Sequence, residues 1–243
     1  MANIPIYRQD AQHPQAQACA ACEIRSSALF GVLDADGLDR IHLHIETLEL
    51  ASDSVVYDRG SSGAAVYTVR TGVVRCERVN SRGERRIMRL AGRGDLIGQE
   101  ALLQRPYGHE AIVCMPTQLC RIPRALIDGL AEKSGALPRE LMLRWQRALD
   151  ASESWMSEVC TGPARLRVLR MLQRLQDHAQ PDGTLWLPRR EEMSAMLDMT
   201  VETASRLISQ LRREGVLERL PVRLARVNAS ALHRALTCAA AGS

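Results

Sequence analysis

Residues 189–228 read RREEMSAMLDMTVETASRLISQLRREGVLERLPVRLARVN, and their pattern predicts the fold of the C-terminal part. Met193, Met196 and Leu197 recur at helical spacing, which predicts one buried face of a short helix. The tripeptide DMT at 198–200 predicts a turn. A second apolar set at helical spacing follows, and it predicts the buried face of a second helix: Ala204, Leu207, Ile208 and Leu211.

The ends of the second helix carry their own signals. The hydroxyl of Thr200 can accept a hydrogen bond from an amide of the first turn, so we expect Thr200 to be the N-cap. Gly215 is suited to the left-handed residue that follows a helix. Residues 216–228 then predict a short two-stranded wing. The stretch therefore reads as a helix-turn-helix followed by a wing.

Polar side chains are left on the outward face of the second helix. The N-terminal part of such a helix enters the DNA major groove, where Arg can bind guanine, Glu can accept from cytosine, and Ser is permissive. A solvated helix could also pair Glu202 with Arg206 four residues on. The helix-turn-helix context favours base reading, and we expect DNA contacts from the following residues: Thr200, Glu202, Ser205, Arg206, Ser209 and Arg213.

Charge is concentrated in the same part of the chain. The 243 residues carry a formal net charge of +4, and residues 161–243 hold thirteen arginines against eight acids. A basic segment around a helix-turn-helix is typical of nucleic-acid binding. The sequence shows no nucleophile–base arrangement, no phosphate-binding glycine loop and no paired catalytic carboxylates, so we expect no enzymatic activity.

Upstream, residues 137–160 show the spacing of a helical seam. Apolar and small residues alternate at intervals of four and three, and Gly162-Pro163 then stops the helix. The seam could pack on the protein's own β domain, but its heptad character favours the same helix of a second subunit. We expect the dimer interface to contain Leu141, Trp145, Ala148, Ser152, Trp155 and Val159.

Short alternating segments separated by glycines fill the N-terminal half. AVYTVRT (65–71), VVRCERV (73–79) and RRIMRLA (85–91) predict strands of a compact antiparallel barrel or roll. We therefore expect an α+β chain with four parts: an N-terminal Cys-containing segment (1–27), a β-roll (28–130), a dimerisation helix (131–160) and a winged helix-turn-helix (161–243).

The second helix resembles the recognition helix of FNR-type regulators in the CRP/FNR superfamily of bacterial transcription regulators. The V-E-T-x-S-R core is present as Val201, Glu202, Thr203, Ser205 and Arg206. The resemblance covers nearly the whole chain and implies a double-stranded β-helix like that of cyclic-nucleotide-binding domains, a dimerisation helix and a winged helix-turn-helix. It further implies that a homodimer reads an inverted TTGAT-like repeat, with half-sites about 34 Å apart, and acts with RNA polymerase.

The roll carries the glycine-rich turn GDLIGQEALL (94–103) of cyclic-nucleotide members. By resemblance, Gln99 takes the place of the ribose-binding glutamate, and His109-Glu110 falls where an Arg-Ser pair would hold the phosphate. A carboxylate there repels a phosphate, and the bidentate arginine is missing. We therefore expect that cAMP is not the effector.

The cysteines suggest a different signal. FNR-type oxygen sensors hold a 4Fe–4S cluster, and the resemblance places three of its ligands on Cys19, Cys22 and Cys120. The remaining N-terminal cysteine is absent, since Ala28 and Phe30 stand where the family has it. The alternatives are redox-active thiols, a zinc site, a roll that binds another effector, and a constitutive regulator. The chain also has no apolar run long enough to span a bilayer, so we expect a cytoplasmic protein.

Overall fold

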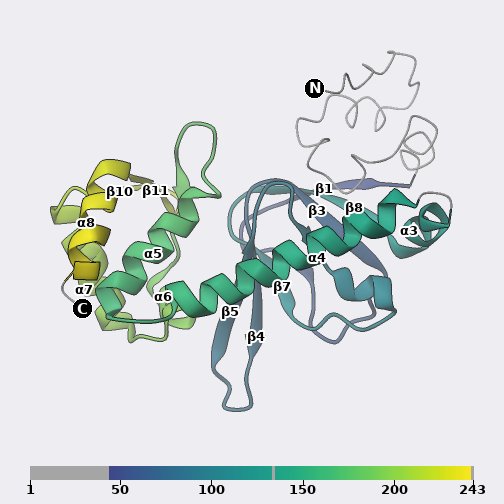
Figure 1. The fold of residues 1–243 in the computed structure, drawn as a ribbon, viewed down its shortest axis with the longest axis horizontal. Helices are drawn as coiled ribbons and strands as arrows, with labels where there is room; N and C mark the ends of the chain where they lie inside the picture. Colours follow the sequence, from purple (N-terminus) through teal and green to yellow (C-terminus); the bar gives the residue numbers. More distant parts are fainter. Residues whose placement is uncertain (1–43, 133–134, 242–243) are drawn as a thin grey trace. The chain divides into compact units, whose positions relative to one another are not determined.

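The strands predicted in the N-terminal half form two four-stranded sheets in the computed structural model, which describes residues 44–132 and 135–241 (Figure 1). The first sheet has the order β1-β8-β3-β6 and contains β1 (Glu46–Leu50), β8 (Thr117–Pro123), β3 (Ala65–Thr71) and β6 (Leu96–Ile97). The second has the order β2-β7-β4-β5 and contains β2 (Val55–Tyr57), β7 (Glu110–Val113), β4 (Val74–Val79) and β5 (Arg85–Ala91).

The interior of the first sheet is built from facing apolar pairs. Strands β3 and β8 are antiparallel, with Val66 opposite Ile122 and Val69 opposite Leu119, and all four side chains are buried. Such cross-strand pairs are the unit of sheet stabilisation. The glycine-rich turn leads into the 3₁₀ helix η2 (Gln99–Leu103), and β8 leads into α3 (Arg124–Ala131).

The predicted long helix is α4 (Ala136–Ser154), which continues as the π-helical turn η3 (Trp155–Val159). At its N-terminal end Leu137 is fully buried. Arg144 is also buried, and it bonds the Gly94 carbonyl at 3.0 Å and the carboxylate of Glu140 at 2.9 Å. The left-handed Gly162 and the following proline end this segment, as the sequence predicts.

The C-terminal part contains the predicted helix-turn-helix and wing. Its elements are α5 (Ala164–Gln176), β9 (Leu185–Trp186), α6 (Arg190–Leu197), α7 (Val201–Arg213), β10 (Leu217–Leu220), β11 (Leu224–Val227) and α8 (Ala229–Ala241). Helix α5 packs against α7 and α8 around buried Val168, Leu169 and Leu172. Strand β9 adds to the wing, which gives a three-stranded sheet of order β10-β11-β9.

The chain divides into two compact units. Of the described residues, those up to 74 and from 91 to 147 make up one unit, and residues 75–90 together with those from 148 to 241 make up the other. The β4–β5 hairpin segment at 75–90 therefore groups with the winged helix. Along the described residues, no helix combines the length and the apolar character that crossing a membrane requires.

Candidate nucleic-acid interface

Helices α6 and α7 are joined by a tight turn whose two ends are fixed by local chemistry. Asp198 closes α6 in the left-handed conformation, with φ of 52°. Thr200 begins α7, and its hydroxyl oxygen accepts a hydrogen bond from the Thr203 amide at 3.2 Å. The predicted N-cap is thus confirmed, and it satisfies one of the amides that the first turn leaves without a helical partner.

The two faces of α7 separate as the sequence predicts. The four apolar residues of the inward face are buried: Ala204, Leu207, Ile208 and Leu211. On the opposite face Glu202, Ser205 and Arg206 are exposed. Farther along, Arg213 is exposed and Ser209 is half-buried. The buried face fixes the helix, and the exposed face is left for an external partner.

The electrostatics of this exposed face suit hydrogen bonding to bases. Hydrogen bonds from its own backbone amide and from the Thr200 hydroxyl lower the pKa of Glu202, so its carboxylate is ionised and able to accept. Within the described part of the chain, the side chains of Ser205 and Arg206 make no hydrogen bond or ion pair. Arg206 is therefore exposed, and no carboxylate from residues 44–132 or 135–241 pairs with its guanidinium.

The far end of α7 is tied to α5. The guanidinium of Arg165 donates two hydrogen bonds to the carboxylate of Glu214, with nitrogen–oxygen distances of 3.2 and 2.6 Å. This contact lowers the pKa of Glu214. Gln210 donates to the same carboxylate at 2.9 Å. Gly215 follows in the left-handed conformation, with φ of 70°, which confirms its predicted role after the helix.

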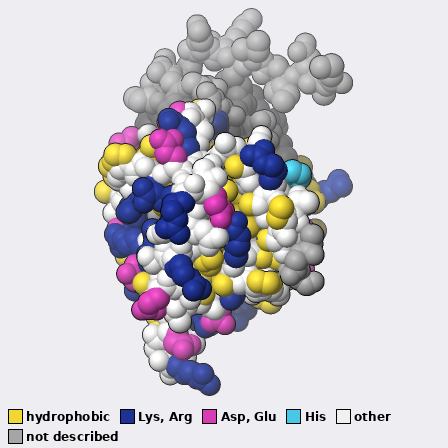
Figure 2. All heavy atoms as spheres, turned by 90° about the vertical axis from the view of Figure 1, so that its left-hand side faces the viewer, with side chains coloured by type: hydrophobic (Ala, Val, Ile, Leu, Met, Phe, Trp, Pro, Cys, Tyr) yellow, Lys and Arg dark blue, Asp and Glu magenta, His cyan; other side chains and the backbone are white. Residues whose placement is uncertain are grey.

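Three arginines that were not predicted from the sequence lie on α7 or close to it. Arg212 and Arg219 line an open groove of about 550 Å³ between the end of α7 and β10. Burial lowers the pKa of Arg190, and the nearby positive charges of Arg219 and Arg212 lower it further. Arg190 begins α6, so three elements bring positive charge together. Figure 2 faces this end of the molecule and shows arginines spread over it among separate acidic side chains.

The glycine-rich turn of the roll at 94–103, where cyclic-nucleotide members bind their ligand, has polar side chains that contact other groups of the roll. Glu100 Oε1 accepts from the Gly108 amide at 3.1 Å and lies 3.3 Å from His109 Nδ1. The other ring nitrogen of His109 lies 2.7 Å from the Tyr57 hydroxyl. Burial alone would raise the pKa of Glu100, but the hydrogen bond and charge of His109 outweigh it and lower the pKa to about 2.

Two tyrosines stack beside His109 in the same part of the roll. The rings of Tyr57 and Tyr107 are stacked with centroids 4.0 Å apart. The Tyr107 hydroxyl donates to the Ala65 carbonyl at 2.7 Å, and burial raises the pKa of Tyr107 to about 12. This part of the roll is therefore internally bonded around Glu100, His109 and the two tyrosines.

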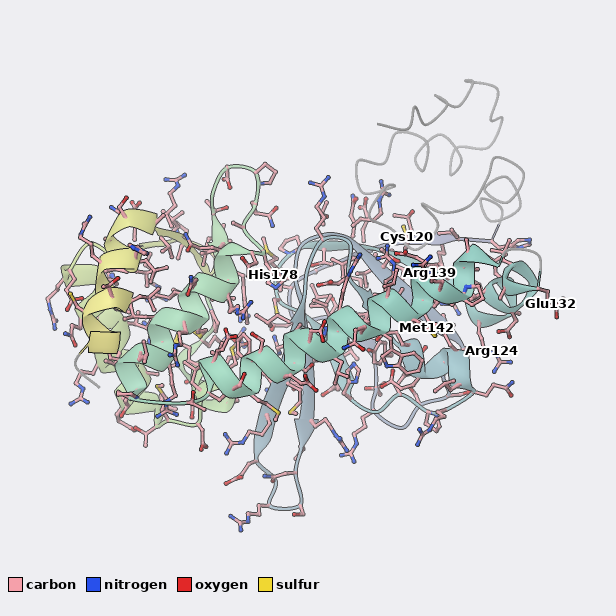
Figure 3. All side chains as sticks on the ribbon, viewed as in Figure 1. Cys120, Arg124, Glu132, Arg139, Met142 and His178 are labelled. Atoms are coloured by element: carbon pink, nitrogen blue, oxygen red, sulfur yellow. The ribbon has the colours of Figure 1, made fainter. Side chains whose placement is uncertain are left out.

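The predicted cysteine ligands fall into two groups. Cys19 and Cys22 lie outside the described residues. Cys120 lies on β8 opposite Thr47 and Thr68 and is partly exposed (Figure 3). No three His, Cys, Asp or Glu side chains among the described residues gather as a metal site. Cys120 alone is therefore the part of the predicted ligand set that can be placed.

The residues predicted for a dimer interface on α4 and η3 differ in their exposure. Trp155 and Val159, which we expected in a dimer interface, are buried within the chain. Leu141, Ala148 and Ser152 are partly exposed. Large apolar side chains stand out along the neighbouring line, with exposed fractions of 65% at Met142, 41% at Trp145, 49% at Leu149 and 61% at Met156. Figure 3 labels Met142 on this helix.

Two family profiles match the parts just described. The cyclic nucleotide-binding domain matches residues 47–134, and the Crp-like helix-turn-helix domain matches residues 166–235. The chain thus joins a roll of that fold to a DNA-binding helix-turn-helix. Together these matches take up more than half of the chain, and the chain belongs to the CRP/FNR family of transcription regulators. It is a DNA-binding regulator and not an enzyme.

Individual relatives agree with this assignment. A probable transcriptional activator of Rhizobium leguminosarum bv. viciae is 26% identical over 205 residues, which span 82% of this chain and 85% of the relative. The nitrogen fixation regulation protein FixK of Bradyrhizobium diazoefficiens is 25% identical, covering 84% and 87%. The solved structure of FixK2 from Bradyrhizobium japonicum superposes with a TM-score of 0.68 at 26% identity, covering 78% of this chain and 96% of that one.

Proposed function

We propose that this regulator binds an inverted TTGAT-like repeat as a homodimer and reads bases with Glu202, Ser205 and Arg206. The observation that carries the proposal is the exposed face of α7, where its first two turns carry an ionised carboxylate and an arginine that has no partner among the described residues. Such groups can accept from cytosine and bind guanine bidentately. Thr200, Ser209, Arg213 and the arginine group at Arg190, Arg212 and Arg219 are then placed to contact phosphates.

Replacement of Arg206 by alanine tests the base-reading role. We expect operator affinity to fall by about 1–3 kcal/mol for each half-site, while salt-dependent binding to random DNA persists. Titration of a fluorescent operator and of a scrambled duplex over a range of salt concentrations measures both. Arg234→Ala on α8 is a matched control, because it removes an exposed arginine outside α7 and the wing. Equal losses on operator and scrambled DNA would remove Arg206 from the set of base-reading residues.

We propose that the dimer forms along the exposed apolar line on α4 and η3. Met142, Trp145, Leu149 and Met156, with Ser152 between the last two, follow the three–four spacing of a helix-to-helix seam. An inverted repeat requires two-fold symmetry, which a parallel pair of these helices would supply. This line takes the place of Trp155 and Val159 in the predicted interface, while Leu141 and Ala148 lie at its edge.

Sedimentation separates this seam from an ordinary apolar surface. Leu149→Glu should convert the dimer to a monomer and weaken binding to the full palindrome. Arg147→Glu is the matched control, since Arg147 is exposed on the same helix but off the line. A Leu149→Glu protein that sediments as a dimer would contradict the proposed interface.

We propose oxygen or redox state as the signal, received by Cys19 and Cys22 together with Cys120. The partly exposed position of Cys120 on β8 supports the proposal, because a core cysteine would be closed to a ligand. Names of relatives such as the anaerobic regulatory protein of Haemophilus influenzae, 23% identical over 206 residues, point the same way. A 4Fe–4S cluster would supply oxygen-sensitive chemistry there, with a non-cysteine ligand completing the set.

The internally bonded Glu100 and His109 support the expectation that cAMP is not the effector, because a phosphate at this turn would meet an ionised carboxylate. Cytoplasmic action together with RNA polymerase follows from the same proposal, since that is where a bacterial regulator meets its promoters.

A spectrum of protein purified without oxygen tests the signal. Broad visible absorbance that bleaches in air, with iron and acid-labile sulfide present, would establish the cluster. Cys19→Ser and Cys22→Ser should abolish it, and Cys238→Ser, which changes an exposed cysteine on α8, should leave it intact. A colourless, iron-free protein that responds to oxidants through the same cysteines would mean a thiol switch. Regulation that ignores both serine variants would instead favour an effector-binding or constitutive regulator.

A further inference from the structure

Glu192 is a buried carboxylate at the third position of α6, where three groups from distant parts of the sequence meet. Its side chain is 5% exposed. One oxygen accepts from the Arg189 amide at 2.6 Å and pairs with Arg223 at 2.5 Å. The other oxygen lies 3.2 Å from a guanidinium nitrogen of Arg75. The carboxylate therefore joins the start of α6, the wing turn and the β4–β5 hairpin within one compact unit.

The hairpin side of this contact is equally buried. Arg75 donates to Glu77 at 2.9 Å, and the exposed fractions of the two side chains are 5% and 1%. Glu77 is paired in turn with Arg85 on the other strand of the hairpin at 3.1 Å. Arg75, Glu77, Glu192 and Arg223 are here called the Glu192 network. Three of its members are almost completely removed from solvent, and two belong to the hairpin.

A buried ion network of this kind contributes more to geometry than to net stability. Desolvation of the charges offsets most of their attraction, yet removing one partner leaves the others buried and uncompensated. The arrangement that pairs every charge is therefore strongly preferred over alternatives in which the hairpin or the wing moves away. The network accordingly fixes where these two elements lie relative to α6.

The wing turn gives independent support for a positioning role. Val222 and Arg223 both adopt left-handed backbone, with φ of 55° and 62°. A β-branched residue in this region is strained, and such strain persists only where the surroundings over-determine it. Three contacts hold Arg223 in this conformation. Its guanidinium pairs with Glu192, and its guanidinium carbon lies 5.4 Å from the centroid of the Trp186 ring. Its carbonyl accepts a hydrogen bond from the Leu187 amide at 2.7 Å.

The hairpin has a second, more exposed attachment to the helix-turn-helix. Arg86 lies 2.7 Å from the carboxylate of Asp198, the residue that ends α6, and the two side chains are 36% and 73% exposed. An exposed pair of this kind contributes little. The buried contact at Glu192 is therefore the stronger attachment of the hairpin to α6.

We propose that Glu192 is a positioning residue for DNA binding: through its network it holds the wing turn and the β4–β5 hairpin on α6, and so sets the wing against the reading helix α7. The inference rests on the proposed function, because it assigns Glu192 a part in operator recognition without contact to DNA. Loss of the carboxylate should loosen both attached elements and reduce selective binding, since base contacts and wing contacts must be made together.

Hydrogen exchange and DNA binding on the full chain test this inference together. Glu192→Gln should raise amide exchange at least about tenfold in residues 75–90 and 221–227. It should also lower the operator-to-random affinity ratio about tenfold. Arg75→Met leaves the Glu192–Arg223 pair in place, so it should raise exchange in 75–90 only. Glu191→Gln is the matched control, since Glu191 is the exposed neighbour and should change neither reading.

The outcomes are distinguishable. Unchanged exchange and an unchanged affinity ratio in a folded Glu192→Gln protein would overturn the inference, as would the same changes in Glu191→Gln. If Glu192→Gln does not fold, the exchange pattern of Arg75→Met decides alone, and no change in 75–90 overturns the inference. A wild-type protein that does not discriminate operator from random DNA defeats the proposed function instead, and the exchange measurements still decide whether the network holds the two elements.

Discussion

Helix α7 and the turn that begins η2 both carry polar side chains of the kind that bind ligands, but they use them differently. On α7 the side chains of Ser205 and Arg206 have no partner among the described residues of the chain. In the roll, His109 bonds Glu100 through one ring nitrogen and Tyr57 through the other. The side chains of Ser205 and Arg206 are available to an external partner, whereas Glu100 Oε1 and both ring nitrogens of His109 already have partners inside the roll.

Polar clusters of similar composition can therefore have different roles in this family. A residue type alone does not mark a binding site, because a buried polar group must be paired with something, and the partner can be internal. The fold of the roll is that of cyclic nucleotide-binding domains, yet the polar groups at the turn where resemblance places the phosphate are engaged with each other. The DNA-binding helix keeps the complementary arrangement, with its apolar face paired and its polar face open.

The largest expected effect concerns the buried face that holds α7. Ile208→Ala removes a fully buried side chain, so we expect the free energy of unfolding to fall by about 2–5 kcal/mol. Arg206→Ala, two residues earlier on the open face, should change it by less than about 0.5 kcal/mol. Urea unfolding monitored by tryptophan fluorescence measures both. Similar losses for the two variants would break the distinction between a holding face and a reading face.

The second effect tests whether the roll cluster is structural. Glu100 has its pKa lowered from about 4.5 to about 2, so its stabilisation is complete above pH 4.5 and is lost as the pH falls through about 2. Glu100→Gln should therefore lower stability by about 1–2 kcal/mol at pH 5, and this difference should shrink towards pH 2. Thermal melts of both proteins across this range provide the measurement.

The operator affinity of Glu100→Gln is the second measurement for this variant. Because the carboxylate of Glu100 pairs internally, we expect Glu100→Gln to bind operator DNA with unchanged affinity at neutral pH. A stability difference that is constant from pH 5 to pH 2 would mean that the ion pair with His109 does not stabilise the roll. The polar cluster of the roll would then not be a stabilising internal network.

Local signals allowed much of the reading helix to be predicted from sequence. Apolar periodicity identified the buried face of α7, and a short hydroxyl side chain and a glycine identified its two ends at Thr200 and Gly215. Alternating apolar residues likewise predicted β3, β4 and β5. All these features depend on residues fewer than about fifteen positions apart, where the period of the chain determines which side chains share a face.

Features that depend on distant residues were not predicted. Glu192 meets Arg75 and Arg223, which lie far away along the chain, and no spacing rule relates such positions. The burial of Trp155 and Val159 inside the chain was not predicted either, because periodicity alone cannot distinguish an apolar line that the chain itself covers from its exposed neighbour.

Helix α8 was also missed, although a signal for it was present. Its alanine-rich sequence has high helix propensity. Asn228 stands directly before it and accepts a hydrogen bond from the Ala231 amide at 3.0 Å, as an N-cap residue does. The pairing of β9 with β11 was beyond sequence reasoning, because two-residue strands carry no periodicity.

A smaller effect is expected at the start of α7. Thr200→Ala removes the side-chain acceptor of the Thr203 amide and should reduce stability by about 1 kcal/mol. It should also remove the Thr200 hydrogen bond that helps to lower the pKa of Glu202. Thermal unfolding measures the first effect, and a Thr200→Ser protein that retains full stability is the control. Equal losses in the alanine and serine variants would contradict the capping role.

A small gain in stability is expected at the wing turn, where Val222 adopts a strained backbone conformation. Val222 is 83% exposed and left-handed, so its side chain contributes strain without packing. Asparagine tolerates this backbone conformation, and Val222→Asn should therefore stabilise the chain by about 0.5–1 kcal/mol. If Arg223 and Glu192 hold the turn, operator binding should stay the same, because the turn keeps its shape when the strain is relieved. Thermal unfolding and operator titration of the same preparation measure both quantities. A gain in stability with a loss of operator affinity would mean that the Val222 side chain itself contacts DNA, so that the wing, like α7, presents a side chain to an external partner.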